Sequence, residues 1–297
     1  MLFLGSHCID TGGIHMAARR AGRGGMQALQ IFSAVPKYYN DKVSVKPERI
    51  ARFREALAQA GIAPAQVIVH AAYVINTATP DPEKWARAAA GLAKEYERST
   101  ALGVGGVCFH PGAATDGDRD GAIARVSEAM RRALEAVPES GTRLLIENTA
   151  GAGTTVGRTP DEVAAMLAGI PAERRHRTGY GLDTCHLFAS GYDLTVSRDA
   201  VTAVLDAFEQ ATGEPPAFLH LNDSEGACGS NKDRHRVIGE GLIGADPFGW
   251  LLQDKRARGI PCILETPQAV ETVAEDDDTP DAWDVDSITR LRAMVGG

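Results

Sequence analysis

Nine side chains of the types that bind metal ions in proteins end or follow short apolar runs of the sequence. Five are histidines and four are carboxylates: His70, His110, Glu147, Asp183, His186, His220, Asp233, His235 and Glu265. Imidazole and carboxylate together suit zinc or manganese. Carboxylates gathered without cations would repel one another. Because a tetrahedral ion takes about four ligands, this set would serve two or three ions, with a carboxylate bridging a close pair.

Local spacings within this set also fit shared sites. Asp183 and His186 are three residues apart at an expected strand-to-helix turn, where they can share a face. Asp233 and His235 flank Arg234 and would point to the same side of an extended segment. Taken alone, each residue has an ordinary structural explanation, such as a helix cap. Their convergence is what predicts a metal centre.

The elements that must bring these residues together are eight short apolar runs separated by helical stretches. The runs are 2–7, 28–32, 67–70, 105–110, 143–148, 179–183, 217–222 and 261–266. Examples of the Ala-rich amphipathic stretches between them are 47–61, 81–103, 119–137 and 159–170. Eight strand–helix units predict an α/β fold, a (β/α)8 TIM barrel, as one domain over 1–297, with the reactive residues at the C-terminal ends of the strands. An open doubly wound sheet is the alternative, but no GxGxxG motif follows the first strand.

Composition and charge exclude several classes of protein. With 44% hydrophobic and 24% charged residues, the chain is of ordinary globular type. Five cysteines without a CxxC pair argue against a disulfide framework or a zinc ribbon. We predict no contact with a membrane, because no apolar run approaches a membrane span. The first residues lack the basic region of a signal peptide, so we predict a cytoplasmic protein, associated with the nucleoid in a prokaryote.

Six segments resemble the endonuclease IV family of apurinic/apyrimidinic (AP) endonucleases. They are VHAAYVIN (69–76), FHPGA (109–113), LLIENTAGAGTTVG (144–157), GYGLDTCHLFASGYDL (179–194), HLNDSEGACGSNKDRHRVIGEGLIG (220–244) and LETP (264–267). The resemblance implies a TIM barrel of base-excision DNA repair with three zinc ions per chain, manganese being an alternative at one site.

The same resemblance implies how the ligands divide among the ions. The first ion would be held by His70, His110 and Glu147. Glu147 would bridge to a second ion, whose other ligands would be Asp183, His220 and Glu265. The third ion would be held by His186, Asp233 and His235. As the bridge, Glu147 is the predicted catalytic residue.

The resemblance further implies a substrate and a reaction. A monomer would cut double-stranded DNA on the 5′ side of an abasic site, leaving a 3′-hydroxyl and a 5′-deoxyribose phosphate, and would trim blocked 3′ ends. The formal charge of −8 argues against phosphate binding. Three divalent ions change it to −8 + 6 = −2 and concentrate positive charge at the site.

Two residues are expected to contact DNA. Tyr73 matches a family residue that wedges into the base stack, with packing under a loop as the alternative. Lys37 lies in FSAVPKYYN (32–40), where the family commonly has an arginine. Lysine lacks the planar guanidinium that stacks on bases, so this loop departs from the family pattern.

Two other classes of function remain as alternatives. A single-metal sugar isomerase or epimerase would need only Glu147, Asp183, His220 and Glu265 and would leave the other five ligands unexplained. A bound-metal count near one would favour it. An inactive DNA-binding or scaffold protein would not need nine intact ligands, and a nuclease assay separates it from an enzyme.

Other titratable groups carry no metal-binding prediction. His7 is expected to hydrogen-bond a loop or contact phosphate. His15 and His176 fall on expected helix or loop positions and receive no role. The acidic segment 275–281 is expected to be a solvated loop.

Overall fold

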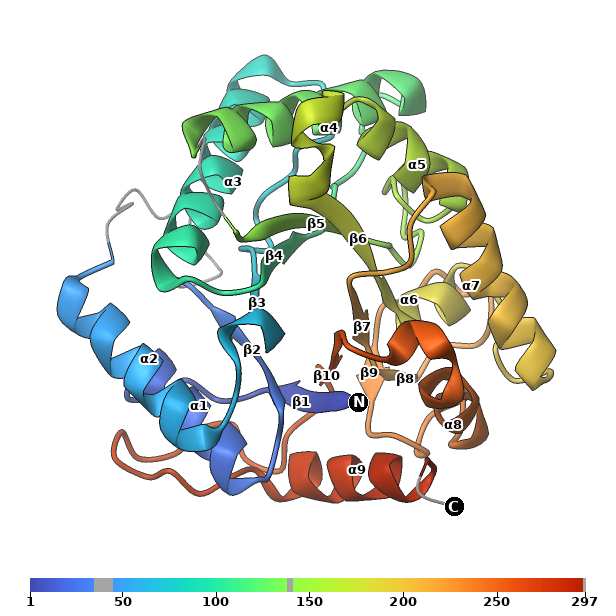
Figure 1. Cartoon of the computed structure of the whole chain (residues 1–297). Coiled ribbons are helices and arrows are strands. Elements are labelled where there is room, and N and C mark those ends of the chain that lie inside the picture. Colours follow the sequence, from blue (N-terminus) through green and yellow to red (C-terminus); the bar gives the residue numbers. More distant parts are fainter. Residues whose placement is uncertain (35–44, 138–140, 296–297) are drawn as a thin grey trace.

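Eight parallel strands close into a barrel in the computed structural model, which describes residues 1–34, 45–137 and 141–295 (Figure 1). The strands are β1 (Phe3–His7), β2 (Ala28–Phe32), β3 (Val67–His70), β4 (Gly106–Phe109), β5 (Arg143–Glu147), β6 (Thr178–Asp183), β7 (Phe218–His220) and β10 (Pro261–Leu264). Neighbours in the barrel follow the order of the chain, and β10 pairs with β1 to close it. The predicted (β/α)8 TIM barrel is confirmed.

Helices surround the barrel on the outside (Figure 1). They are α1 (Ile14–Arg23), α2 (Pro47–Ala60), α3 (Pro82–Leu102), α4 (Arg119–Ala136), α5 (Pro160–Ala168), α6 (Thr184–Ala189), α7 (Arg198–Thr212), α8 (Asp246–Gln253) and α9 (Ala282–Ala293). Helix α3 shows why they start and stop where they do. The carboxylate of Asp81 accepts hydrogen bonds from the first-turn N–H groups, and Gly103 ends the helix at φ 79°, which glycine adopts without strain.

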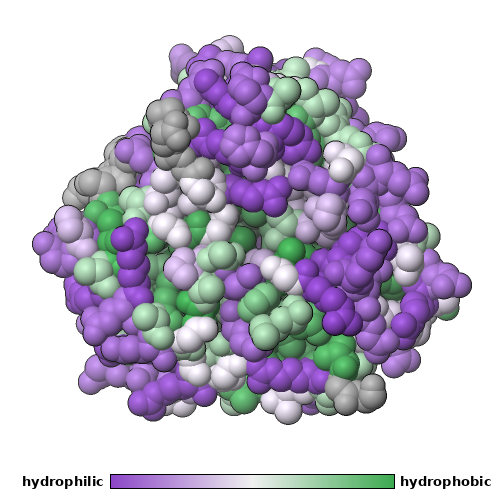
Figure 2. Space-filling model, in the orientation of Figure 1, coloured by the Kyte–Doolittle hydropathy of each residue, from purple (hydrophilic) through white to green (hydrophobic). Residues whose placement is uncertain are grey.

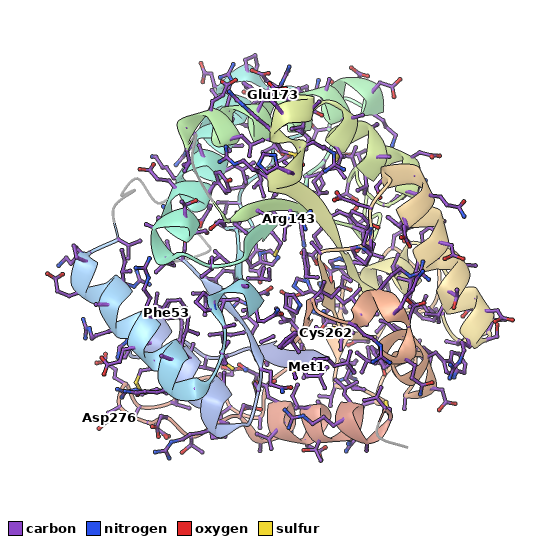
Figure 3. All side chains as sticks on the ribbon, viewed as in Figure 1. Met1, Phe53, Arg143, Glu173, Cys262 and Asp276 are labelled. Carbon is purple, nitrogen blue, oxygen red and sulfur yellow. The ribbon has the colours of Figure 1, made fainter. Side chains whose placement is uncertain are left out.

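Inside the barrel, one layer of side chains is apolar and fully buried. It consists of Ala28, Ile68, Cys108, Leu145, Phe218 and Ile263. Gly181 leaves the space that the Phe218 ring fills, since a Cβ there would lie 2.1 Å from the ring. Figure 3 looks along the barrel, with the labelled residues Met1, Arg143 and Cys262 around its centre; Arg143 and Cys262 lie at the beginnings of β5 and β10, and Met1 lies just before β1. In the same view, Figure 2 shows hydrophilic residues over the outer helices and more hydrophobic ones toward the axis.

The structure adds a short antiparallel hairpin that the sequence did not predict. It pairs β8 (Asp223–Ser224) with β9 (His235–Arg236) after β7. The buried carboxylate of Asp223 accepts hydrogen bonds from the N–H groups of Gly239, Gly241 and Ile243. The hairpin and its following loop are thereby fixed over the end of the barrel.

The acidic segment 275–281 packs against α1, so it is not simply a solvated loop. Asp278 forms an ion pair with Arg23 at 3.0 Å, and the buried Arg20 donates hydrogen bonds to the carbonyl oxygen of Asp277. Some of its side chains, including that of Asp276, remain exposed. Among the described helices, none has the length and apolar character of a membrane span.

Candidate metal centre

All nine predicted ligands meet at the end of the barrel where the strands finish. His70, Glu147, Asp183 and His220 are the last residues of their strands, and His110 and Glu265 directly follow theirs. His186 lies in the first turn of α6, while Asp233 and His235 come from the β8–β9 hairpin and the segment before it. The side chains form overlapping groups whose potential ligand atoms lie within 4.8 Å of one another.

Glu147 lies at the centre of the cluster and is fully buried. Its Oε2 atom is 3.3 Å from Nε2 of His70 and 3.2 Å from Nε2 of His110. Its Oε1 atom is 2.9 Å from Nδ1 of His220. Burial alone would raise the pKa of Glu147, but His220 and His110 outweigh it and hold this pKa well below its usual range. The carboxylate is therefore ionised, and its two oxygen atoms face different histidines.

A second group consists of Glu147, Asp183, His220 and Glu265. Nδ1 of His220 lies 3.1 Å from Oε2 of Glu265 and 4.0 Å from Oδ2 of Asp183. The buried amide of Asn222 donates hydrogen bonds to both of these carboxylates. Against the effect of burial, His220 lowers the pKa of Glu265 to about 2. Three carboxylates thus surround one imidazole.

The third group is formed by His186, Asp233 and His235. The Nε2 atoms of the two histidines lie 3.2 and 3.1 Å from the two oxygens of the Asp233 carboxylate. Asp183 caps α6 by accepting a hydrogen bond from the N–H group of His186 at 2.8 Å. Burial alone would lower the pKa of His235, but nearby carboxylates, chiefly Asp183, raise it to about 9.

The main chain sets the ring orientation of three of the histidines, His70, His186 and His235. Their Nδ1 atoms lie 2.8, 2.8 and 3.1 Å from the carbonyl oxygens of Ala71, Asn148 and Glu265. A carbonyl oxygen only accepts hydrogen bonds, so Nδ1 carries the proton and Nε2 faces the centre of the cluster. Each of these rings thus donates through one nitrogen and presents the other to the cluster, as metal-binding histidines commonly do.

The donor set fits metal ions of the zinc class. Among the described residues, buried Oε2 of Glu147 and Nε2 of His186 and His235 find no hydrogen-bond partner of suitable geometry. Such atoms are costly to bury unless something else binds them, and a divalent cation satisfies imidazole and carboxylate together. Magnesium prefers oxygen ligands and keeps its water, so it suits histidine-rich groups poorly. The cluster can bind metal ions.

The metal centre opens into a cavity of about 430 Å³ that is also lined by Tyr73, Arg234 and Thr266. The Tyr73 side chain is 63% exposed, and its ring is 5.2 Å from that of His70 and 5.4 Å from that of Phe32. Within the described part of the chain, Tyr73 therefore stands exposed at the mouth of the site. Lys37, the other expected DNA contact, lies outside the described residues.

Several residues at the site were not found from the sequence. Asn148 directly follows Glu147, and Asn222 comes two residues after His220. Both lie within segments that resemble the family, and this position next to a predicted ligand could have identified them. Gln30 is the single polar residue in the apolar run ALQIF (28–32). Cys108 and Cys185 lie within ligand distance of the cluster. The His7 ring contacts the Gln30 side chain, and its carbonyl oxygen accepts a hydrogen bond from Gln268 in the loop after β10. Burial lowers the pKa of His7 to about 4.

Comparison with known proteins agrees with this geometry. Residues 17–292 match a family model described as a xylose isomerase-like TIM barrel. The probable endonuclease 4 of Geobacter sulfurreducens is 37% identical over 290 residues, which are 97% of this chain and 94% of the relative. The probable endonuclease 4 of Methanoculleus marisnigri is 38% identical over 268 residues, 90% of this chain and 93% of the relative.

Solved structures give the same result. The crystal structure of endonuclease IV from Thermus thermophilus matches with a TM-score of 0.81 and 30% identity, covering 99% of this chain and 98% of that one. A D-allulose 3-epimerase from Methylomonas sp. matches with a TM-score of 0.65 at 18% identity, covering 99% and 96%, and so shares the fold alone. On its sequence and its structure, the chain belongs to the endonuclease IV family of AP endonucleases.

Proposed function

We propose that this enzyme is a zinc-dependent AP endonuclease of base-excision DNA repair. It hydrolyses the phosphodiester bond 5′ to an abasic site, leaving a 3′-hydroxyl and a 5′-deoxyribose phosphate, and it trims blocked 3′ ends. The observation that carries the proposal is the convergence of the nine predicted ligands around the buried Glu147, in overlapping groups whose potential ligand atoms lie within 4.8 Å of one another. A single-metal epimerase would use only the second group and would leave the other histidines without a role in metal binding.

In this proposal, His70 and His110 bind one ion together with Glu147. Glu147 also faces the second group, so its carboxylate would be shared between the first and the second ion. The third ion is bound by the three remaining ligands, His186, Asp233 and His235. When bound, such ions supply Lewis-acid chemistry, which makes water a nucleophile near neutral pH and stabilises the negative charge of a phosphate undergoing attack.

The chain's own residues hold the ions in place and shape the entrance for DNA. Backbone carbonyls orient three of the imidazoles, and the Asn222 amide orients two carboxylates. Tyr73 stacks at the lesion from the mouth of the cavity, where its exposed ring can reach a base. Lys37, which lies outside the described residues, is a further DNA contact in this proposal. An abasic nucleotide enters more readily than an intact one because it has no base to unstack.

The remaining parts of the proposal concern the setting of the enzyme. Zinc occupies all three sites, with manganese as an alternative at one. The substrate is double-stranded DNA, the enzyme acts as a monomer, and it works in the cytoplasm, at the nucleoid in a prokaryote. The whole chain, 1–297, acts as one domain.

The test combines elemental analysis with cleavage of a duplex that carries one abasic analogue at a defined position. We expect about three zinc ions per chain, incision on the 5′ side and a 3′ end that a polymerase can extend; the intact duplex is the control. Prolonged chelation should abolish incision, and zinc should restore it while magnesium alone should not. Incision that persists in chelator with magnesium, or one ion per chain without incision, would overturn the proposal.

A further inference from the structure

Gln30 is a fully buried amide whose side chain contacts four hydrogen-bonding side chains inside the barrel, those of His7, Cys108, His220 and Glu265. It is the third residue of β2 and lies next to His7 in the register of β1 and β2. Its side chain also reaches His220 and Glu265, which are 190 and 235 residues away in the sequence. Gln30 thus lies directly behind the second ligand group.

The orientation of the Gln30 amide follows from Glu265. An ionised carboxylate only accepts hydrogen bonds, so the Nε2 group of Gln30, which contacts Oε1 of Glu265, must donate to it. The second Nε2 proton is directed toward Nδ1 of His7 at 3.0 Å. The Oε1 atom is then left facing Nε2 of His220 at 2.7 Å, and it must accept a hydrogen bond there.

His220 is therefore oriented in the opposite sense to the histidines held by the main chain. Its Nε2 carries a proton toward Gln30, and its Nδ1 faces the carboxylates of Glu147 and Glu265 at 2.9 and 3.1 Å. In His70 and His186, Nδ1 donates to a backbone carbonyl and Nε2 faces the cluster. The orientation of the His220 ring thus depends on a side chain, which can be exchanged by mutation.

We infer that Gln30 is a positioning residue, which makes Nδ1 of His220 the metal-binding nitrogen and holds Glu265 beside it for the second ion. The inference rests on the proposed function, because it concerns the metal ions of that site. Gln30 touches neither the ions nor the DNA and acts only through two of the ligands. Removing its amide should weaken the binding of one ion and leave the binding of the others unchanged.

Two variants separate the contact of Gln30 with His220 from its contact with Glu265. Gln30→Met keeps the length of the side chain but removes both hydrogen-bonding groups. We expect it to weaken binding of one zinc ion by about 10- to 100-fold, as loss of a partner behind a ligand typically does. Gln30→Glu keeps an acceptor for His220 but repels Glu265. It should weaken the binding of the same ion while Nε2 of His220 stays protonated.

The readouts are zinc affinities from competition with a chelator and the ¹⁵N spectrum of the histidine rings in the zinc-loaded protein, with His220 assigned by its absence in His220→Asn. In the wild type, the His220 signal should show Nε2–H and a metal-bound Nδ1, and Gln30→Met should lose this pattern. Gln66→Met is the matched control, because Gln66 is a buried glutamine just before β3, at the opposite end of the barrel from the ligands. It should change neither readout.

Each outcome decides between the two ideas. If the wild type binds zinc and incises DNA while Gln30→Met keeps every zinc affinity and the His220 pattern, the positioning role is wrong and the proposed function stands. Equal weakening of all the ions in Gln30→Met would make Gln30 a packing residue and would also overturn the inference. If the wild type takes up no zinc, both proposals fail.

Discussion

Two layers of side chains inside the barrel come from the same strands but differ in chemistry. The lower layer is apolar and consists of Ala28, Ile68, Cys108, Leu145, Phe218 and Ile263. Two residues further along each of these strands, the next inward positions are Gln30, His70, His110, Glu147, His220 and Glu265. Side chains alternate between the two faces of a strand, so one register places an apolar floor directly beneath an ionic layer.

The difference between the layers shows which residues maintain the fold and which serve the site. The apolar floor is buried packing and excludes water beneath the ligands. The ionic layer buries carboxylates and imidazoles at a cost that bound cations offset. Substitutions in the lower layer should therefore act on stability, and substitutions in the upper layer should act on metal binding and activity. Strand β5 contributes one residue to each layer, Leu145 to the lower and Glu147 to the upper.

The largest expected effect is that of Glu147→Gln in the upper layer of β5. Glutamine keeps the shape but removes the charge that, in the proposed function, is shared between two ions. We expect incision to fall to less than about a hundredth of the wild-type turnover, a loss of about 2.7 kcal/mol or more in transition-state stabilisation. Turnover on the abasic duplex, metal content and circular dichroism measure this. A variant with full metal content and near-normal turnover would contradict the bridging role.

Leu145→Ala, in the lower layer of the same strand, should have the opposite profile. Leu145 is 1% exposed, and truncating a buried leucine costs about 2–5 kcal/mol of the free energy of unfolding. Urea denaturation of the zinc-loaded protein measures the loss. Zinc content and turnover per folded molecule should remain close to those of the wild type. If Leu145→Ala instead loses metal while staying stable, the two layers are not separable.

Tyr73→Ala tests the mouth of the site, above the predicted ligands, and should change lesion recognition by a smaller factor. A stacked base contact is worth about 1–3 kcal/mol, so discrimination between abasic and intact duplex should fall by about 5- to 150-fold. Competition binding measures it, and zinc content should be unchanged because Tyr73 is not a ligand. Tyr73→Phe keeps the ring and is the control. Unaltered discrimination in Tyr73→Ala would mean that another part of the mouth recognises the lesion.

The smallest expected effect is a difference in pH dependence between the metal-free and the zinc-loaded protein. Burial lowers the pKa of His70 and His235, but hydrogen bonds and neighbouring carboxylates raise both to about 9 from 6.5. A raised histidine pKa contributes stability that is complete below 6.5 and is lost as the pH rises through about 9.

The midpoint of thermal unfolding should therefore fall between pH 7 and 9 in the metal-free protein and change less once zinc replaces the protons. Calorimetry of both forms in matched buffers measures this. A midpoint of the metal-free protein that rises over this range would show that the histidines do not pair with the carboxylates.

The sequence by itself determined the barrel and the edge at which its ligands meet. Continuous apolar runs are a strong local signal of strands buried on both faces, and the predicted ranges agree with the observed strands to within a few residues. A ligand at the end of a strand needs only its position in the chain to be placed at the C-terminal face. His70, Glu147 and Asp183 illustrate this.

Only the tertiary structure decided how those ligands are oriented. The proton on a particular ring nitrogen depends on the acceptor that faces it, and for His220 that acceptor is Gln30, 190 residues away. The β8–β9 hairpin that carries His235 likewise depends on pairing and on buried Asp223, because strands of two residues leave no periodic signal. Spacing along the chain fixes which residues reach the rim, whereas hydrogen-bond partners brought together by barrel closure fix which atom each residue presents.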